Sequence, residues 1–223
     1  MAPVTSRPRP PWLERACQAA GAVGPIVFST AWLVNGRRQH DYSPVDEHIS
    51  GLAALDADHP RTSMAGFLVL GTCTMAFATA VHRALGGRGR AGIGPALLFL
   101  SGAGAVSAGL LRRDTVLLNP PDRPAGYEQS WHNDGHDLSA AVIYTCAVTA
   151  PLAIARKVKG DPAWHGVAPA AVGASVASLG LMAFFATDVD RHGNGLVQRA
   201  MVTLPQALLV AASIRLLRRP LPR

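Results

Sequence analysis

The chain has 223 residues, of which 16% are charged and 49% are hydrophobic, and its formal net charge is +7. A soluble domain carries about 25% charged residues, so this composition favours an integral membrane protein. The basic residues stand in short clusters between apolar runs and form no basic face with aromatic residues, which argues against a nucleic-acid-binding protein.

Six long apolar runs follow one another along the chain. Each is close to the roughly 20 residues that a helix needs to cross the hydrocarbon layer of a membrane. Because such runs are too long for half-buried strands, we predict an all-α fold, a polytopic bundle of six transmembrane helices. The runs are Ala16–Gly36, Thr62–Val81, Ala91–Leu111, Leu138–Ala155, Gly166–Thr187 and Gly193–Ile214.

The charges between the runs predict the orientation of the bundle. Six spans put both termini and two connections on one side, and that side holds 13 of the 21 Lys and Arg residues but only two of the 14 acidic residues. Cytoplasmic segments are enriched in Lys and Arg, so we predict an N-in/C-in protein of the cytoplasmic membrane. Residues 1–15 and 218–223 are then basic cytoplasmic segments, and residues 16–217 form the membrane domain.

The first run has an alternative interpretation. Arg7, Arg9 and Arg15 precede it and the small residues Ser29 to Ala31 lie within it, as in a cleaved signal peptide. The run is long for the apolar part of a signal peptide, so a retained first helix is favoured.

Six of the eight histidines and nearly all of the carboxylates fall on the predicted outer side. The first outer loop includes Asp41 to Pro60, and within it the apolar residues from Ile49 to Leu55 predict a short amphipathic turn on the membrane surface. Long loops in a small protein are more often functional than idle, so we expect the functional groups on this side.

His132 and His136 stand four residues apart, directly before the fourth run. In a helix this spacing puts both imidazoles on one face, which suits a divalent metal such as zinc. A carboxylate from another loop would complete such a site, and the candidates are Asp114, Asp188 and Asp190.

Gly135 lies between these histidines and favours a helix that starts only near His136. In that case Asp134 or Asp137 would cap the helix and no metal would be bound. The sequence leaves both interpretations open, and the second is the favoured one.

Arg199 lies about two turns inside the sixth run, where an unpaired charge is costly. We expect it to pair with an outer acid, first of all Asp114. The alternative is that its side chain extends to nearby lipid headgroups.

Four short motifs agree in order and placement with a known family. They are DYSPVDEHISGLAA from Asp41, Arg113-Asp114 after the third run, GHDLSA from Gly135, and GLVQR from Gly195. In these motifs the chain resembles, over residues 16–217, the prokaryotic six-helix membrane proteins called domain of unknown function 998. The resemblance carries over Tyr42, Ser43, Pro44, Asp114, His136, Gln198 and Arg199. His132 has no counterpart in the pattern, and Arg112-Arg113 stands where the family has an apolar lead-in with proline.

The residues and the resemblance together predict a polar outer site. We expect His136, Asp114 and Arg199 to be its catalytic residues, and the substrate-binding residues to be Tyr42, Ser43, Gln198, Asp188 and Asp190. The expected partners are the lipid bilayer and a lipid-linked or small polar molecule, which the protein would bind, hydrolyse or transfer. The alternative is a non-catalytic accessory or structural subunit, or a small transporter.

Overall fold

The structure, a computed structural model, describes residues 10–86, 92–118, 126–189 and 191–220. Over these residues it is all-helical, with six helices long and apolar enough to cross a membrane, which confirms the predicted fold class. The helices are α1 (Pro11–Arg38), α2 (Pro60–Ala84), α3 (Ile93–Leu110), α4 (Trp131–Lys157), α5 (Val167–Thr187) and α6 (Asn194–Leu217), and two short 3-10 helices are η1 (Ile49–Ala53) and η3 (Pro162–Trp164).

The six helices form a closed ring in chain order. Each helix packs against the next, and α6 returns to pack against α1, while α4 and α6 face each other across the centre with little contact. The first and last helices are also hydrogen-bonded, since Ser213 Oγ donates to the Gln18 carbonyl at 2.6 Å and Arg15 Nη1 to the Leu217 carbonyl at 2.6 Å.

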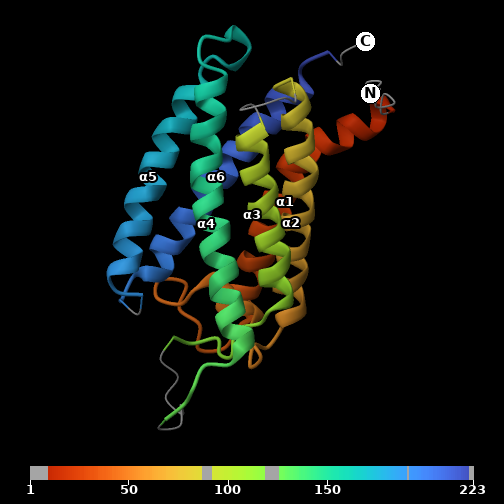
Figure 1. Ribbon diagram of the computed structural model, residues 1–223. Coiled ribbons are helices and arrows are strands. Elements are labelled where there is room, and N and C mark those ends of the chain that lie inside the picture. Colours follow the sequence, from red (N-terminus) through yellow and green to blue (C-terminus); the bar gives the residue numbers. More distant parts are fainter. Residues whose placement is uncertain (1–9, 87–91, 119–125, 190, 221–223) are drawn as a thin grey trace, which may run out of the picture.

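The start of α1 and the end of α6 lie at the same end of the ring (Figure 1), as an even number of spans requires. We call this the terminal end. The opposite end, here called the loop end, holds the connections from α1 to α2, from α3 to α4 and from α5 to α6. Nearly all of the predicted site residues belong to the loop end.

The tightest helix contact lies between α2 and α3. A Cβ atom added to Gly71 would stand 2.5 Å from the Gly102 carbonyl oxygen, and one added to Gly102 would stand 2.7 Å from that of Gly71. Only glycine permits two backbones to approach this closely. Such close packing is common between membrane helices, because in lipid the hydrophobic effect does not drive their association.

The start of α4 differs from the prediction. The helix begins at Trp131, and the side chain of Ser130 caps it by accepting a hydrogen bond from the Asn133 N–H at 3.2 Å. Gly135 therefore lies inside the helix, where a Cβ atom would stand 2.8 Å from a methyl group of Leu111. Close packing against the end of α3, rather than helix propensity, explains this glycine.

The expected caps of α4 were also wrong. Asp134 and Asp137 lie on the exposed side of the helix, where both accept hydrogen bonds from Gln129 Nε2, at 3.2 and 2.9 Å. A serine that precedes them in the chain fills the capping position instead.

The amphipathic turn in the first connection forms as η1, but it does not lie on the membrane surface. Ile49 and Leu52 are only 2% and 1% exposed, because η1 enters the ring at the loop end. The Arg112 side chain donates hydrogen bonds to the carbonyls of Ala53 at 3.1 Å and Ala54 at 2.5 Å. These hydrogen bonds replace the ones that water would make to the two buried carbonyl groups.

Candidate functional site

Arg199 joins α6 to the first connection. Its Nη1 donates to the carbonyls of Glu47 at 2.9 Å and Gly195 at 2.8 Å, and its Nη2 donates to the Tyr42 hydroxyl at 2.5 Å. The Tyr42 hydroxyl in turn donates to the His48 carbonyl at 3.2 Å. Burial is the main reason why the pKa of Tyr42 is raised, so this hydroxyl stays protonated.

The predicted ion pair between Arg199 and Asp114 is not formed. Asp114 instead accepts hydrogen bonds from the Ser130 amide at 2.8 Å, from the Ser130 hydroxyl at 2.5 Å and from the Tyr127 hydroxyl. Partial burial raises the pKa of Asp114, but these hydrogen bonds outweigh it and hold the pKa below its ordinary value. Asp114 thus stays ionised and supports the residue that caps α4.

Gln198 and Ser43 also connect the first loop to α6. Gln198 Oε1 accepts a hydrogen bond from the Ile49 N–H at 2.6 Å, which holds the start of η1. The Ser43 hydroxyl donates to Asp46 at 2.8 Å, and Asp46 accepts a further bond from the Gly193 N–H at 2.9 Å. Both residues that the resemblance carried over therefore position this loop.

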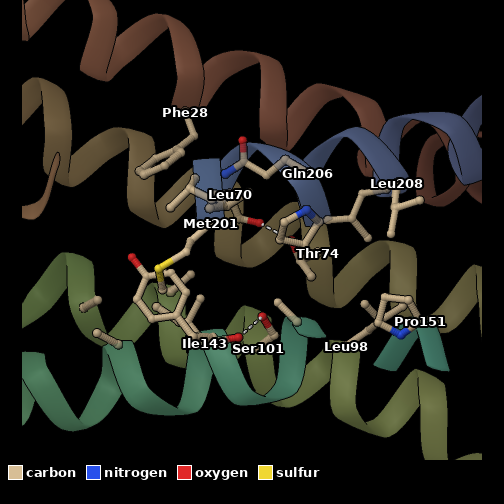
Figure 2. A pocket seen from close by; sticks show the side chains of 18 of the residues that line it. Phe28, Leu70, Thr74, Leu98, Ser101, Ile143, Pro151, Met201, Gln206 and Leu208 are labelled. Atoms are coloured by element: carbon tan, nitrogen blue, oxygen red, sulfur yellow. Dashed lines mark hydrogen bonds between the residues drawn. The ribbon is translucent and has the colours of Figure 1, made fainter. Parts of the chain in front are cut away.

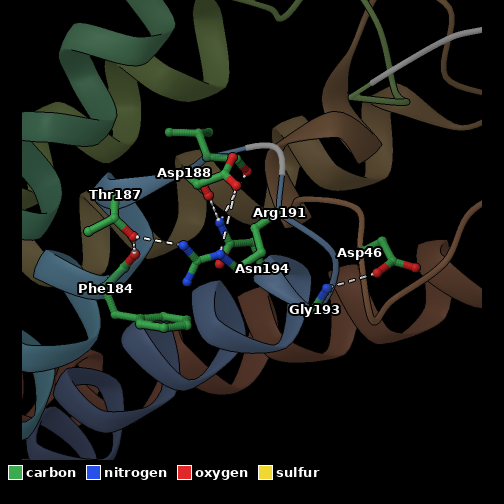
Figure 3. A network of polar contacts seen from close by, with 8 residues as sticks. Asp46, Phe184, Thr187, Asp188, Arg191, Gly193 and Asn194 are labelled. Atoms are coloured by element: carbon green, nitrogen blue, oxygen red, sulfur yellow. Dashed lines mark hydrogen bonds and ion pairs between the residues drawn. The ribbon is translucent and has the colours of Figure 1, made fainter.

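Asp188 belongs to a network that shapes the turn between α5 and α6 (Figure 3). Its carboxylate lies 3.8 Å from Arg191 Nε, and its carbonyl accepts a hydrogen bond from Asn194 Nδ2. Arg191 also donates to the Thr187 hydroxyl at 3.2 Å and lies over the Phe184 ring. Asp190 lies outside the described residues.

His136 and His132 lie on the same helix but in different surroundings. His136 is 2% exposed, and its Nδ1 lies 2.8 Å from the Leu111 carbonyl oxygen and 3.0 Å from that of Ala108. Both neighbours are acceptors, so Nδ1 carries the proton and Nε2 is the acceptor. His132 is exposed and stacks on Trp131 at 3.6 Å between the ring centres.

No metal centre joins these two histidines. Within the described part of the chain, no three His, Cys, Asp or Glu side chains are grouped so that they could hold an ion.

The structure brings together two residues, His48 and Arg113, that were not predicted as site residues. His48 is 4% exposed, and its Nδ1 accepts a hydrogen bond from Arg113 Nη1 at 3.4 Å. Burial, followed by the nearby charges of Arg113 and Arg199, lowers the pKa of His48 to about 4. This histidine is therefore neutral at pH 7. The departure of Arg112-Arg113 from the family pattern was the one signal in the sequence that pointed here.

A cavity of about 130 Å³ occupies the centre of the ring. It extends along α4 from His136 near the loop end to Ile154 near the terminal end, and all six helices contribute to its wall. Figure 2 shows part of this wall, with residues of α1, α2, α3, α4 and α6. Ile49 and Ser50 of η1 line one end of it, and Trp164 lines the other.

The polar groups in the wall of this cavity are mostly occupied by the protein itself. The Thr74 hydroxyl donates to the Leu70 carbonyl at 2.8 Å and the Ser101 hydroxyl to the Ile143 carbonyl at 3.3 Å. Gln206 Oε1 accepts a hydrogen bond from Ser29 at 3.2 Å. What these residues present to the cavity is therefore largely carbon.

A family model described as a protein of unknown function, DUF998, matches residues 22–215, and the chain belongs to that family. This confirms the resemblance found in its motifs. No curated protein and no solved structure matches the chain.

Proposed function

We propose that this DUF998 protein lies in the cell membrane and binds a lipid with one long apolar chain inside its ring of helices. The observation that carries the proposal is the central cavity, which is apolar, narrow and long. Between His136 and Ile154, α4 rises by about 27 Å at 1.5 Å per residue, which approaches the roughly 30 Å thickness of the hydrocarbon layer.

The volume of the cavity excludes a bulky ligand. A volume of about 130 Å³ is similar to that of apolar cavities that stay dry and hold one small hydrocarbon. A long chain would therefore enter only as the surrounding side chains and helices move apart. A path for polar solutes would need free polar groups along its wall, but the hydroxyls of Thr74 and Ser101 and the Oε1 atom of Gln206 are engaged in hydrogen bonds within the protein.

The contacts of the predicted catalytic residues favour binding over hydrolysis or transfer. Among the described residues, no hydroxyl or thiol donates a hydrogen bond to His136, whose Nδ1 is held by two carbonyl oxygens. The Asp114 oxygens accept hydrogen bonds from Ser130 and Tyr127, which orient α4. Both residues support the wall of the lipid site in this proposal.

Filling the cavity tests the proposal. Ala147 lines it, so Ala147→Phe places a phenyl ring where the chain would lie. Wild-type protein purified in detergent should carry about one long-chain lipid molecule per protein molecule. The variant should retain at most about a tenth of this lipid, because the phenyl ring leaves no room for the lipid tail. Mass spectrometry of the extracted lipid measures this.

Ala141→Phe is the matched control, since Ala141 lies on α4 but is exposed and is not part of the cavity wall. It should retain the lipid of the wild type. A wild-type protein without bound lipid, or an Ala147→Phe variant that keeps it, would contradict the proposal.

The N-in/C-in orientation is part of this proposal, and it is supported by the charge distribution. In a chain whose three cysteines are replaced by serine, single cysteines at Gly126 and Gln129 should react with an impermeant thiol reagent on intact cells. Both positions are exposed at the loop end, and a cysteine at the exposed Gly160 of the terminal end should stay unlabelled. Labelling of Gly160 from outside would reverse the orientation.

A further inference from the structure

The geometry points to an oxyanion-binding site formed by Arg113, His48 and Arg199 at the loop end, which takes the phosphate or carboxylate headgroup of a single-chain lipid. The inference rests on the proposed function, which places the apolar chain of the lipid in the central cavity. The headgroup site itself is carried by the separate observations that follow.

Three elements bring these side chains together. Arg113 follows α3, His48 precedes η1, and Arg199 lies in the second turn of α6. Arg113 Nη1 lies 3.4 Å from His48 Nδ1, and the charges of both arginines act on the His48 ring. One guanidinium group thus contacts a buried, neutral imidazole, and a second is close enough to act on it by its charge.

Each of the three side chains has a buried nitrogen without a hydrogen-bond partner. These are Nε of Arg113, Nε of Arg199 and Nε2 of His48. Because His48 Nδ1 accepts from Arg113, its Nε2 carries the proton, so all three nitrogens are donors. The Val189 backbone lies beside the His48 ring, but not in hydrogen-bonding geometry with Nε2. Buried donors without acceptors are uncommon in folded proteins, and an oxyanion would supply the acceptors.

No described residue forms an ion pair with either of the two arginines. Neither has a described carboxylate oxygen within 4 Å. Asp114 is close enough to Arg113 to feel its charge, but the Asp114 oxygens are taken by Ser130 and Tyr127. Two cations near a neutral histidine, with the carboxylate beside Arg113 engaged elsewhere, make a site of positive potential.

Two of the three residues are chain neighbours of residues that line the end of the central cavity. Ile49, which follows His48, and Gln198, which precedes Arg199, both line the cavity. His136 is in the cavity wall as well and feels the charge of Arg113. A lipid with its chain in the cavity would therefore have its head among the three donors.

Three probes of equal chain length separate the head from the chain: an alkyl phosphate, a fatty acid and an alkyl alcohol. Binding to the purified full-length chain, stripped of lipid, can be followed by quenching of the fluorescence of Trp164, which lines the cavity. At least one of the two anions should bind at least about 10-fold more tightly than the alcohol, as charge-assisted hydrogen bonds predict.

Arg113→Gln should abolish this preference and leave the affinity for the alcohol unchanged, and Arg113→Lys should restore part of it. Arg38→Gln removes the same charge at an exposed position, so the affinities for the anions and for the alcohol should stay as in the wild type. The ranking of the phosphate against the fatty acid identifies the headgroup. Without ligand, the Arg113→Gln variant should melt no lower than the wild type, because it removes an unpaired charge.

The two proposals fail in different ways. Equal binding of all three probes by the wild type would reject the oxyanion site and leave the lipid cavity standing, whereas no binding of any probe would reject the proposed function. A lower melting temperature of unliganded Arg113→Gln would assign Arg113 to folding and overturn the site.

Discussion

Arg199→Ala is expected to lower the free energy of unfolding by about 3–5 kcal/mol, because it removes three charge-assisted hydrogen bonds at once. The carbonyls of Glu47 and Gly195 and the Tyr42 hydroxyl would all lose their donor. Arg199→Lys should recover only part of the loss, since an ammonium group cannot reproduce the planar fork. Unfolding of the purified protein in mixed detergent micelles measures the effect.

A double-mutant cycle with Tyr42→Phe isolates one of these contacts. The two substitutions together should cost less than the sum of their separate effects by about 1 kcal/mol or more, since they remove the same hydrogen bond. Arg38→Ala, at an exposed position, should cost less than about 0.5 kcal/mol. Additive losses at Tyr42 and Arg199 would show that the contact contributes nothing.

Acidification from pH 6.5 to pH 4 is expected to cost about 3 kcal/mol of stability through His48 alone. The pKa of His48 is lowered from 6.5 to about 4 in the folded protein, and each unit of difference corresponds to about 1.4 kcal/mol. Below pH 6.5 the unfolded chain takes up a proton that the folded chain does not, so stability is full above that pH and falls as the pH approaches 4.

Thermal unfolding of lipid-free protein across this range measures the slope. His48→Gln should flatten it, because glutamine does not titrate. Asp46, Asp58 and Asp114 also have lowered pKa values, but their contribution is lost at lower pH than that of His48. An identical slope in the wild type and in His48→Gln would contradict the assignment.

The number and order of the transmembrane helices could be predicted from the sequence. An apolar run of about 20 residues that crosses a membrane must satisfy its backbone hydrogen bonds internally, and a helix does so. Helix ends were less predictable. Gly135 suggested a late start of α4 on helix propensity, whereas packing against Leu111 decided the outcome. Tertiary contacts commonly override so weak a preference.

The partners of the site residues could not be read from the sequence. Arg199 was expected to pair with an acid, but η1 descends into the ring and brings the Glu47 carbonyl and the Tyr42 hydroxyl to it. The path of a loop depends on contacts such as that between Arg112 and the backbone of Ala53, and the pattern of apolar residues in the sequence does not predict such contacts. Whether His136, Asp114 and Arg199 take part in a reaction remains a prediction from the motifs.

The closed ring also constrains how the protein is made. Five of the six helix contacts that close the ring join neighbours in the chain, so each can form as soon as the next helix has entered the membrane. The sixth contact joins α1 to α6, and until it forms the Leu217 carbonyl has no hydrogen bond from Arg15 and α1 exposes the face that will meet α6. During synthesis the nascent protein therefore remains open on one side until its last helix has been inserted.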